Sequence, residues 1–142
     1  MKIYASAGSL TRVLRATLGI FASLCPIVAS PAYGNVISTI QTPPSQIIED
    51  LSTSETLHDL SLANLIATNC EIEGVKAGDA ALIAGTAQTV ASHMGLSIDD
   101  YFSTYLQPAL QEISAPDACE KHAETTRDIA LKLQELGGSV IE

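Results

Sequence analysis

Residues 97–113 read SIDDYFSTYLQPALQEI, and their apolar positions decide the fold class. Ser97 and Asp100 have the spacing of a helix N-cap and its partner. Pro108 lacks a backbone N–H, so we expect a kink or a restart of the helix there. The stretch therefore predicts an amphipathic helix. Its apolar positions, which recur at helical spacing, are Ile98, Tyr101, Phe102, Tyr105, Leu106, Ala109, Leu110 and Ile113.

An earlier helix is predicted from a second cap-like pattern. Ser52-x-x-Glu55 has the spacing of a capping box, which predicts a helix that begins near Thr53. The apolar pattern continues from there toward Cys70, and a break near residues 59–61 is allowed.

Glycine and proline positions mark two further helices. Asp79 can cap a helix that runs to Met94 and closes at Gly95, and Pro116 suits the first turn of a last helix that ends at residues 137–138. No segment alternates with period two long enough to predict a strand. The sequence thus predicts an all-α fold, a small bundle of four to five helices. The expected buried face of the helix that runs to Met94 is Ile83, Ala87, Val90 and Met94. The expected buried face of the last helix is Cys119, His122, Thr126, Ile129, Leu133 and Leu136.

Charge is distributed unevenly along the chain. The first 32 residues hold three cations and no acid, and the other 110 hold all 16 carboxylates and four cations, a net charge of −12. The uncharged run at residues 16–29, followed by small residues, predicts a signal peptide over residues 1–32 with cleavage near Ala32. A retained anchor, which needs about 20 apolar residues, and lipid attachment at Cys25 are the alternatives. We expect a periplasmic or secreted protein without membrane insertion after cleavage.

The mature chain is expected to contain a lead-in and one domain. Residues 33–52 form the lead-in, with a short helix allowed from Pro44 to Leu51, and residues 53–142 form the helical domain. The acidic body excludes nucleic-acid binding, because it offers no cationic surface for phosphates.

Signal cleavage would leave two cysteines, Cys70 and Cys119. An even pair in an exported protein is typical of a disulfide, which would close a loop of about 50 residues and contribute roughly 4 kcal/mol. Two free thiols are one alternative. A metal site is another, because Cys119 and His122 have half-site spacing, although no second half-site exists.

No group of residues forms a recognisable catalytic pattern. Asp99 and Asp100 lie in the first turn of a helix, where the helix dipole favours negative charge. His58 and His93 stand apart in the sequence, and His122 is expected to be buried and hydrogen-bonded. The chain lacks a nucleophile elbow and a phosphate-binding glycine loop. We therefore expect neither enzymatic activity nor a cofactor or metal.

An apolar face on the helix of residues 97–113 is the candidate interaction surface. Core packing is the ordinary explanation for such a face, and a patch that binds a client or a partner protein is the alternative. Its residues are Tyr101, Phe102, Tyr105 and Leu106.

The surroundings of the two cysteines resemble a known family. Thr68-Asn69-Cys70-Glu71, and Ala118-Cys119 followed by a polar amphipathic helix, are similar to the HdeA/HdeB-type periplasmic acid-stress chaperones over residues 68–136. This resemblance implies a small helical body that binds unfolded periplasmic proteins once acid loosens its folded or dimeric state.

A titration argument stands beside that resemblance. Between neutral pH and about pH 2 the carboxylates protonate and the three histidines become charged, so the net charge of the body changes from −12 to about +7. Self-repulsion of this kind weakens a compact state and exposes apolar helix faces. The competing hypothesis is an exported adaptor, inhibitor or immunity-type module that binds one protein partner at neutral pH. A homodimer is compatible with both hypotheses.

Overall fold

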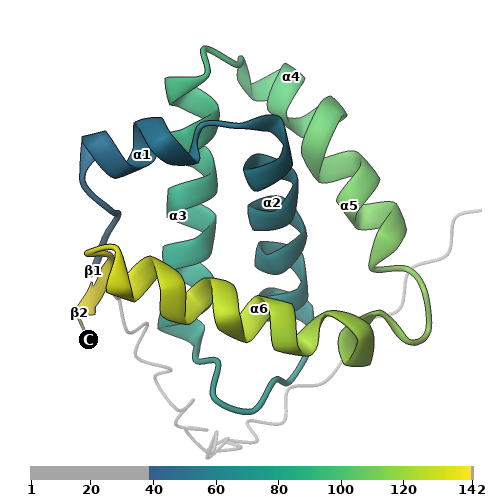
Figure 1. Ribbon diagram of the computed structural model, residues 1–142. Helices are drawn as coiled ribbons and strands as arrows, with labels where there is room; N and C mark the ends of the chain where they lie inside the picture. The colour runs from purple at the N-terminus through teal and green to yellow at the C-terminus, as the bar shows by residue number, and fades with distance from the viewer. Residues whose placement is uncertain (1–38, 142) are drawn as a thin grey trace, which may run out of the picture. The chain divides into compact units, whose positions relative to one another are not determined.

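The computed structural model describes residues 39–141, which form a helical bundle with one short sheet (Figure 1). The all-α fold class is confirmed. The expected signal peptide lies outside the described residues. In chain order the elements are β1 (Thr39–Gln41), α1 (Ser45–Leu51), α2 (Ser54–Asn69), α3 (Ala77–His93), α4 (Ile98–Tyr101), the π-helical turn η1 (Phe102–Leu106), α5 (Gln107–Glu112), α6 (Ala118–Glu135) and β2 (Ser139–Ile141).

The main core forms where α2, α3 and α6 meet. α2 and α3 lie side by side as an antiparallel pair, and α6 crosses both of them (Figure 1). α2 is continuous, so the break allowed near residues 59–61 does not occur; Ser61 is buried, and its hydroxyl donates to the Leu57 carbonyl oxygen at 2.7 Å. The predicted face of α3 is confirmed. Its residues, three of them fully buried and the last partly buried against the same cluster, are Ile83, Ala87, Val90 and Met94.

A two-stranded antiparallel sheet joins the two ends of the described chain. β1 pairs with β2, and Ile40 lies opposite Val140. The expectation of no strand was wrong, because three-residue strands are too short to produce a period-two pattern. The sheet packs closely on α3 at two glycines: an added Cβ at Gly78 would collide with Val140, and one at Gly85 would collide with Ile40. The part of the lead-in that the structure describes, residues 39–52, thus packs on the helices, and its short helix, α1, is confirmed.

Two helix caps differ from the predicted ones by position. Thr53, rather than Ser52, is the N-cap of α2, and its Oγ1 accepts a hydrogen bond from the Thr56 backbone N–H at 3.1 Å. Lys76 precedes α3, and Asp79 sits inside its first turn, where the carboxylate accepts from the Lys76 N–H at 2.8 Å. The cap of α2 is displaced because Ser52 and Thr53 can both serve as caps. In α3, Asp79 is the N3 partner of a capping box and not the N-cap.

The interruption expected at Pro108 is present as a change of helix type. α4, η1 and α5 follow one another without a break, and the Gln107 N–H donates to the carbonyl oxygen of Phe102, five residues earlier. The wider turn ends at Leu106, two residues before Pro108, which cannot donate to the helix. Because a π turn shifts the faces of a helix, the apolar set does not share one buried face: Ile98 and Leu110 are exposed.

The disulfide between Cys70 and Cys119 is present, with the two Cα atoms 5.6 Å apart. It joins the end of α2 to the first turn of α6 across 49 residues. Cys119 is exposed, so the predicted buried face of α6 begins only after it; the face is otherwise buried or partly buried. None of the helices within residues 39–141 is both long and apolar enough to cross a membrane.

Candidate functional site

An apolar groove lies between the end of α3 and α4 and encloses about 440 Å³. Gly95, with φ +73°, closes α3 and lets the chain turn back toward α4. This turn sets Leu96 against the core, and the groove lies between α4 and the last two turns of α3. The groove is lined by Gln88, Ala91, Ser92, Leu96, Ser97, Ile98, Tyr101, Phe102 and Leu106.

Two large apolar side chains of this groove are exposed to solvent. Ile98 is 86% exposed and Phe102 is 50% exposed. They come from adjacent turns of one continuous helix, α4 and η1, and both line the same hollow. An apolar hollow with exposed apolar side chains along it is typical of a surface that binds another molecule.

Two tyrosines connect this helix to α2. The Tyr101 hydroxyl and the Ser61 hydroxyl form a hydrogen bond of 3.2 Å, and the Tyr105 hydroxyl donates to Ser54 Oγ at 3.3 Å. Burial raises the pKa of Tyr101, and the hydrogen bond with Ser61 offsets part of that rise. The ring centroids lie 6.2 Å apart, so the two tyrosines also contact each other. They fix the position of the groove wall against the core.

Three of the four residues of the candidate apolar face line the groove, namely Tyr101, Phe102 and Leu106. Tyr105 is only 8% exposed and belongs to the main core. The sequence pattern did not identify the α3 side of the groove, because Gln88, Ala91 and Ser92 carry no signal that distinguishes them from other helix positions. Only the turn at Gly95 indicates that α3 and α4 meet there.

Two carboxylates stand beside the groove. Asp99 and Asp100 are exposed in the first turn of α4, and Ser97 caps this helix as predicted, since its Oγ accepts from the Asp100 N–H at 3.1 Å. The Ser97 hydroxyl also donates to Asp100 Oδ2 at 2.6 Å. Within residues 39–141, no cation lies within ion-pair distance of either carboxylate.

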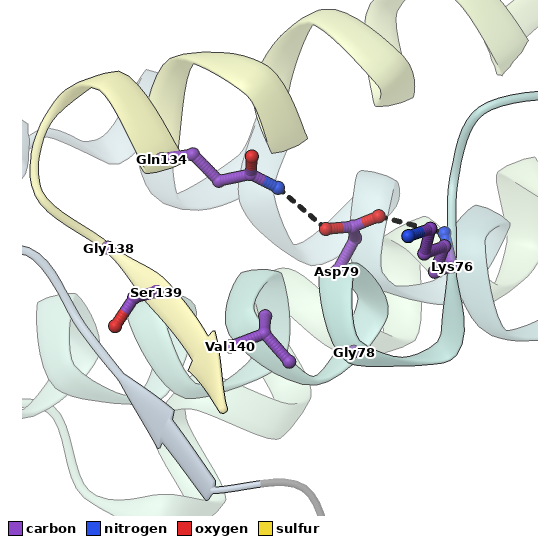
Figure 2. Close-up of a pocket in the computed structure, with 7 residues that line it drawn as sticks. All are labelled: Lys76, Gly78, Asp79, Gln134, Gly138, Ser139 and Val140. Atoms are coloured by element: carbon purple, nitrogen blue, oxygen red, sulfur yellow. Dashed lines mark hydrogen bonds between the residues drawn. The ribbon is translucent and has the colours of Figure 1, made fainter. Parts of the chain in front are cut away.

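A second hollow, of about 460 Å³, lies between the start of α3 and β2 (Figure 2). Its central feature is the Asp79 carboxylate, which accepts from Gln134 Nε2 at 2.7 Å through one oxygen and from the Lys76 N–H at 2.8 Å through the other (Figure 2). One oxygen therefore holds α3 to α6, and the other caps the start of α3. This carboxylate has a structural role.

A third hollow, of about 200 Å³, contains two histidines. His122 is largely buried, as predicted, with its Nε2 3.2 Å from Glu112 Oε1, but the direction of approach does not meet hydrogen-bond geometry. The predicted hydrogen bond is thus not formed at this nitrogen. His58, with its Nδ1 3.5 Å from Asp59 Oδ1, lies on the α2 side of the same hollow. Lys121 Nζ approaches Glu112 Oε1 at 3.8 Å.

The alternative metal half-site at Cys119 is excluded by the disulfide, which occupies the sulfur. Among the described residues, no three His, Cys, Asp or Glu side chains gather closely enough to hold a metal ion. His93 makes a different contact: its Nδ1 lies 3.1 Å from the Ser52 hydroxyl.

Comparison with known proteins returns no match, whether to protein-family models, to curated proteins or to solved structures. The function is therefore argued from the groove and its surroundings.

Proposed function

We propose that the chain is an exported, non-enzymatic binding protein whose apolar groove holds a segment of another protein. The observation that carries the proposal is the exposure of Ile98 and Phe102 along one hollow of the folded structure. Covering Ile98 with a partner contributes about 1.5–3 kcal/mol, and covering the exposed half of Phe102 contributes about half as much. After the cost of association, such an anchor supports a reversible complex.

The chemistry of the groove supports binding rather than catalysis. Its lining contains no carboxylate, imidazole, amine or thiol, and its one titratable group, the Tyr101 hydroxyl, is already bonded to Ser61. The groove volume of about 440 Å³ lies within the ~300–1,000 Å³ range of ligand sites, which are mostly apolar with a few polar groups.

The proposal is tested with the protein purified after export with its own leader. Binding of a fluorescein-labelled apolar peptide is followed by anisotropy for the wild type, I98S and F102S. A matched control is L131S, because Leu131 on α6 is 51% exposed but does not line the groove. We expect I98S and F102S to weaken binding about tenfold or more and L131S to leave it unchanged. Equal affinity in all four proteins would exclude the groove as the binding site.

A second candidate function, an acid-activated chaperone for unfolded periplasmic proteins, is favoured by the histidine hollow. At neutral pH Glu112 and Asp59 face His122 and His58 across α2, α5 and α6. Between neutral pH and about pH 2 the net charge of residues 33–142 changes from −12 to about +7. Self-repulsion on this scale weakens the packing of α6 against α2 and α5. The Cys70–Cys119 disulfide limits the expansion that follows.

This second function predicts a specific response to acid. Between pH 7 and pH 2 the wild type should loosen reversibly, take up an apolar-surface dye and suppress aggregation of an unfolded client. H122Q, which removes the imidazole that lies 3.2 Å from Glu112 Oε1, should loosen at a lower pH. An unchanged circular dichroism spectrum without dye uptake would remove the acid mechanism and leave the neutral-pH binding module.

A further inference from the structure

Exposed carboxylates gather around the groove. Asp99 and Asp100 directly follow Ile98, which lines the groove. The last turn of α1 and the first turn of α2 lie at the same end of the molecule (Figure 1). They add three exposed carboxylates, Glu49, Asp50 and Glu55.

The cations of the described residues do not line the groove; the nearest to the α1–α2 turn is Lys132, which lines another hollow together with Leu51 and Thr56. Lys121, Arg127 and Lys132 belong to α6, and Lys76 immediately precedes α3, at the far end of that helix from the groove. None of these four side chains lines the groove. The one basic group near it is His93, which is already in contact with the Ser52 hydroxyl.

The two carboxylates next to the groove differ in the hydrogen bonds that they accept. Asp100 accepts from the Ser97 hydroxyl at one oxygen, as part of the cap of α4. Asp99 makes no side-chain hydrogen bond or ion pair within residues 39–141. Both remain exposed and able to pair with a cation that arrives with a ligand.

Resting on the binding function proposed above, we propose that the groove's occupant is a protein segment whose apolar anchor is flanked by Lys or Arg. The apolar side chains of this segment enter the hollow beside Ile98 and Phe102. Its flanking cations then face Asp99 and Asp100. A segment flanked by Glu or Asp is repelled by the same pair, so the carboxylates select among apolar segments by sign of charge.

The expected selectivity is moderate, because exposed ion pairs contribute little individually. Two such pairs, each contributing about 0.2–1 kcal/mol, correspond to roughly a twofold to thirtyfold preference for the basic segment. Since the carboxylates are exposed, the preference should shrink when the salt concentration is raised above the physiological range.

The test uses two labelled peptides with one shared apolar core, flanked by lysines in one and by glutamates in the other. Anisotropy titrations compare the purified wild-type protein with D99N/D100N and with E124Q/D128N. The last variant also removes two negative charges, but from exposed positions of α6. We expect the lysine-flanked peptide to bind the wild type several-fold more tightly, D99N/D100N to lose this preference, and E124Q/D128N to keep it.

The outcomes separate this inference from the function on which it rests. Equal binding of both peptides, or a preference that D99N/D100N retains, would overturn the charge selection, whereas groove binding stands if F102S weakens the binding of both peptides about tenfold or more. A preference lost equally in both double variants would also overturn it, because the overall charge of the protein would then be responsible. If neither peptide binds the wild type, the binding function and the charge selection both fail.

Discussion

The two ends of the α2–α3 pair are stabilised by different means. At one end, which we call the disulfide end, Cys70 is bonded to Cys119, and a second apolar cluster closes around the fully buried Ile66. At the other, the groove end, α3 turns at Gly95 into α4, and Ile98 and Phe102 stay exposed. The comparison indicates that one end holds the fold together while the other keeps apolar surface available to a partner.

The largest effect should come from removing the covalent bond of the disulfide end. C70A/C119A should lower the free energy of unfolding by about 4 kcal/mol, because a loop spanning 49 residues is no longer closed in the unfolded chain. Urea denaturation followed by circular dichroism measures this change. As a control, a reducing agent should destabilise the wild type to the same extent and leave the variant unaffected. A loss below about 1 kcal/mol would mean that packing alone holds this end.

An isoleucine stands at each end, and replacing each with alanine gives the next test. I66A should cost about 2–5 kcal/mol, because Ile66 is fully buried and its truncation leaves a cavity. I98A should change stability by less than about 0.5 kcal/mol, since Ile98 is 86% exposed. Both values come from the same denaturation experiment. Comparable losses in the two variants would show that the groove end is part of the stabilising core, contrary to the proposed division.

The sequence predicted the disulfide end more completely than the groove end. The two cysteines outside the expected signal peptide allow a single pairing, and helical periodicity places the buried face of α3 correctly. The number of cysteines and the spacing of apolar residues can both be read directly from the sequence. The predicted cap of α2, Ser52, is one residue before the observed cap, Thr53. Both residue types can cap a helix, and the choice between them depends on how α1 ends.

The groove itself depends on how separate helical segments pack against one another, and local sequence patterns do not show this packing. Helical spacing alone places Phe102 and Tyr105 on the same apolar face. The π turn before Pro108 decides that Tyr105 is buried while Phe102 is exposed. The sheet was missed for a related reason: β1 and β2 are short, and their pairing across nearly the whole described chain has no local signature.

A smaller effect is expected at the tyrosine that joins the two helices under the groove. Y101F removes the hydrogen bond with Ser61 and should cost up to about 1 kcal/mol at neutral pH, because Ser61 keeps its bond to the Leu57 carbonyl oxygen. Since burial raises the pKa of Tyr101, the folded state holds this proton more tightly than the unfolded state. The stability that the phenol contributes is therefore fully present below about pH 10 and is lost as the pH rises through the raised value.

Denaturation at about pH 8 and about pH 11 checks this dependence. The wild type should lose more stability than Y101F between the two conditions, because the ring of the variant carries no hydroxyl proton to release. Parallel losses in both proteins would mean that Tyr101 is as free to ionise in the folded state as in the unfolded chain, and that the groove wall is not packed against α2.

The smallest effect on overall stability is expected from the cap of α4, and it tests whether the groove end opens independently. S97A removes the acceptor of the Asp100 N–H, but α4 is four residues long and contains no buried residue. We expect a loss of about 0.5 kcal/mol in the free energy of unfolding, together with faster hydrogen exchange confined to the amides of α4. T53A, the matched change at the start of α2, should cost about 1 kcal/mol and accelerate the slowest amides of α2 and α3 together, because that helix is part of the core. If S97A also accelerated those slowest amides, α4 would unfold only with the whole bundle. The groove would then be a rigid surface, and the exposed Ile98 would have to be recognised in the conformation that the free protein already has.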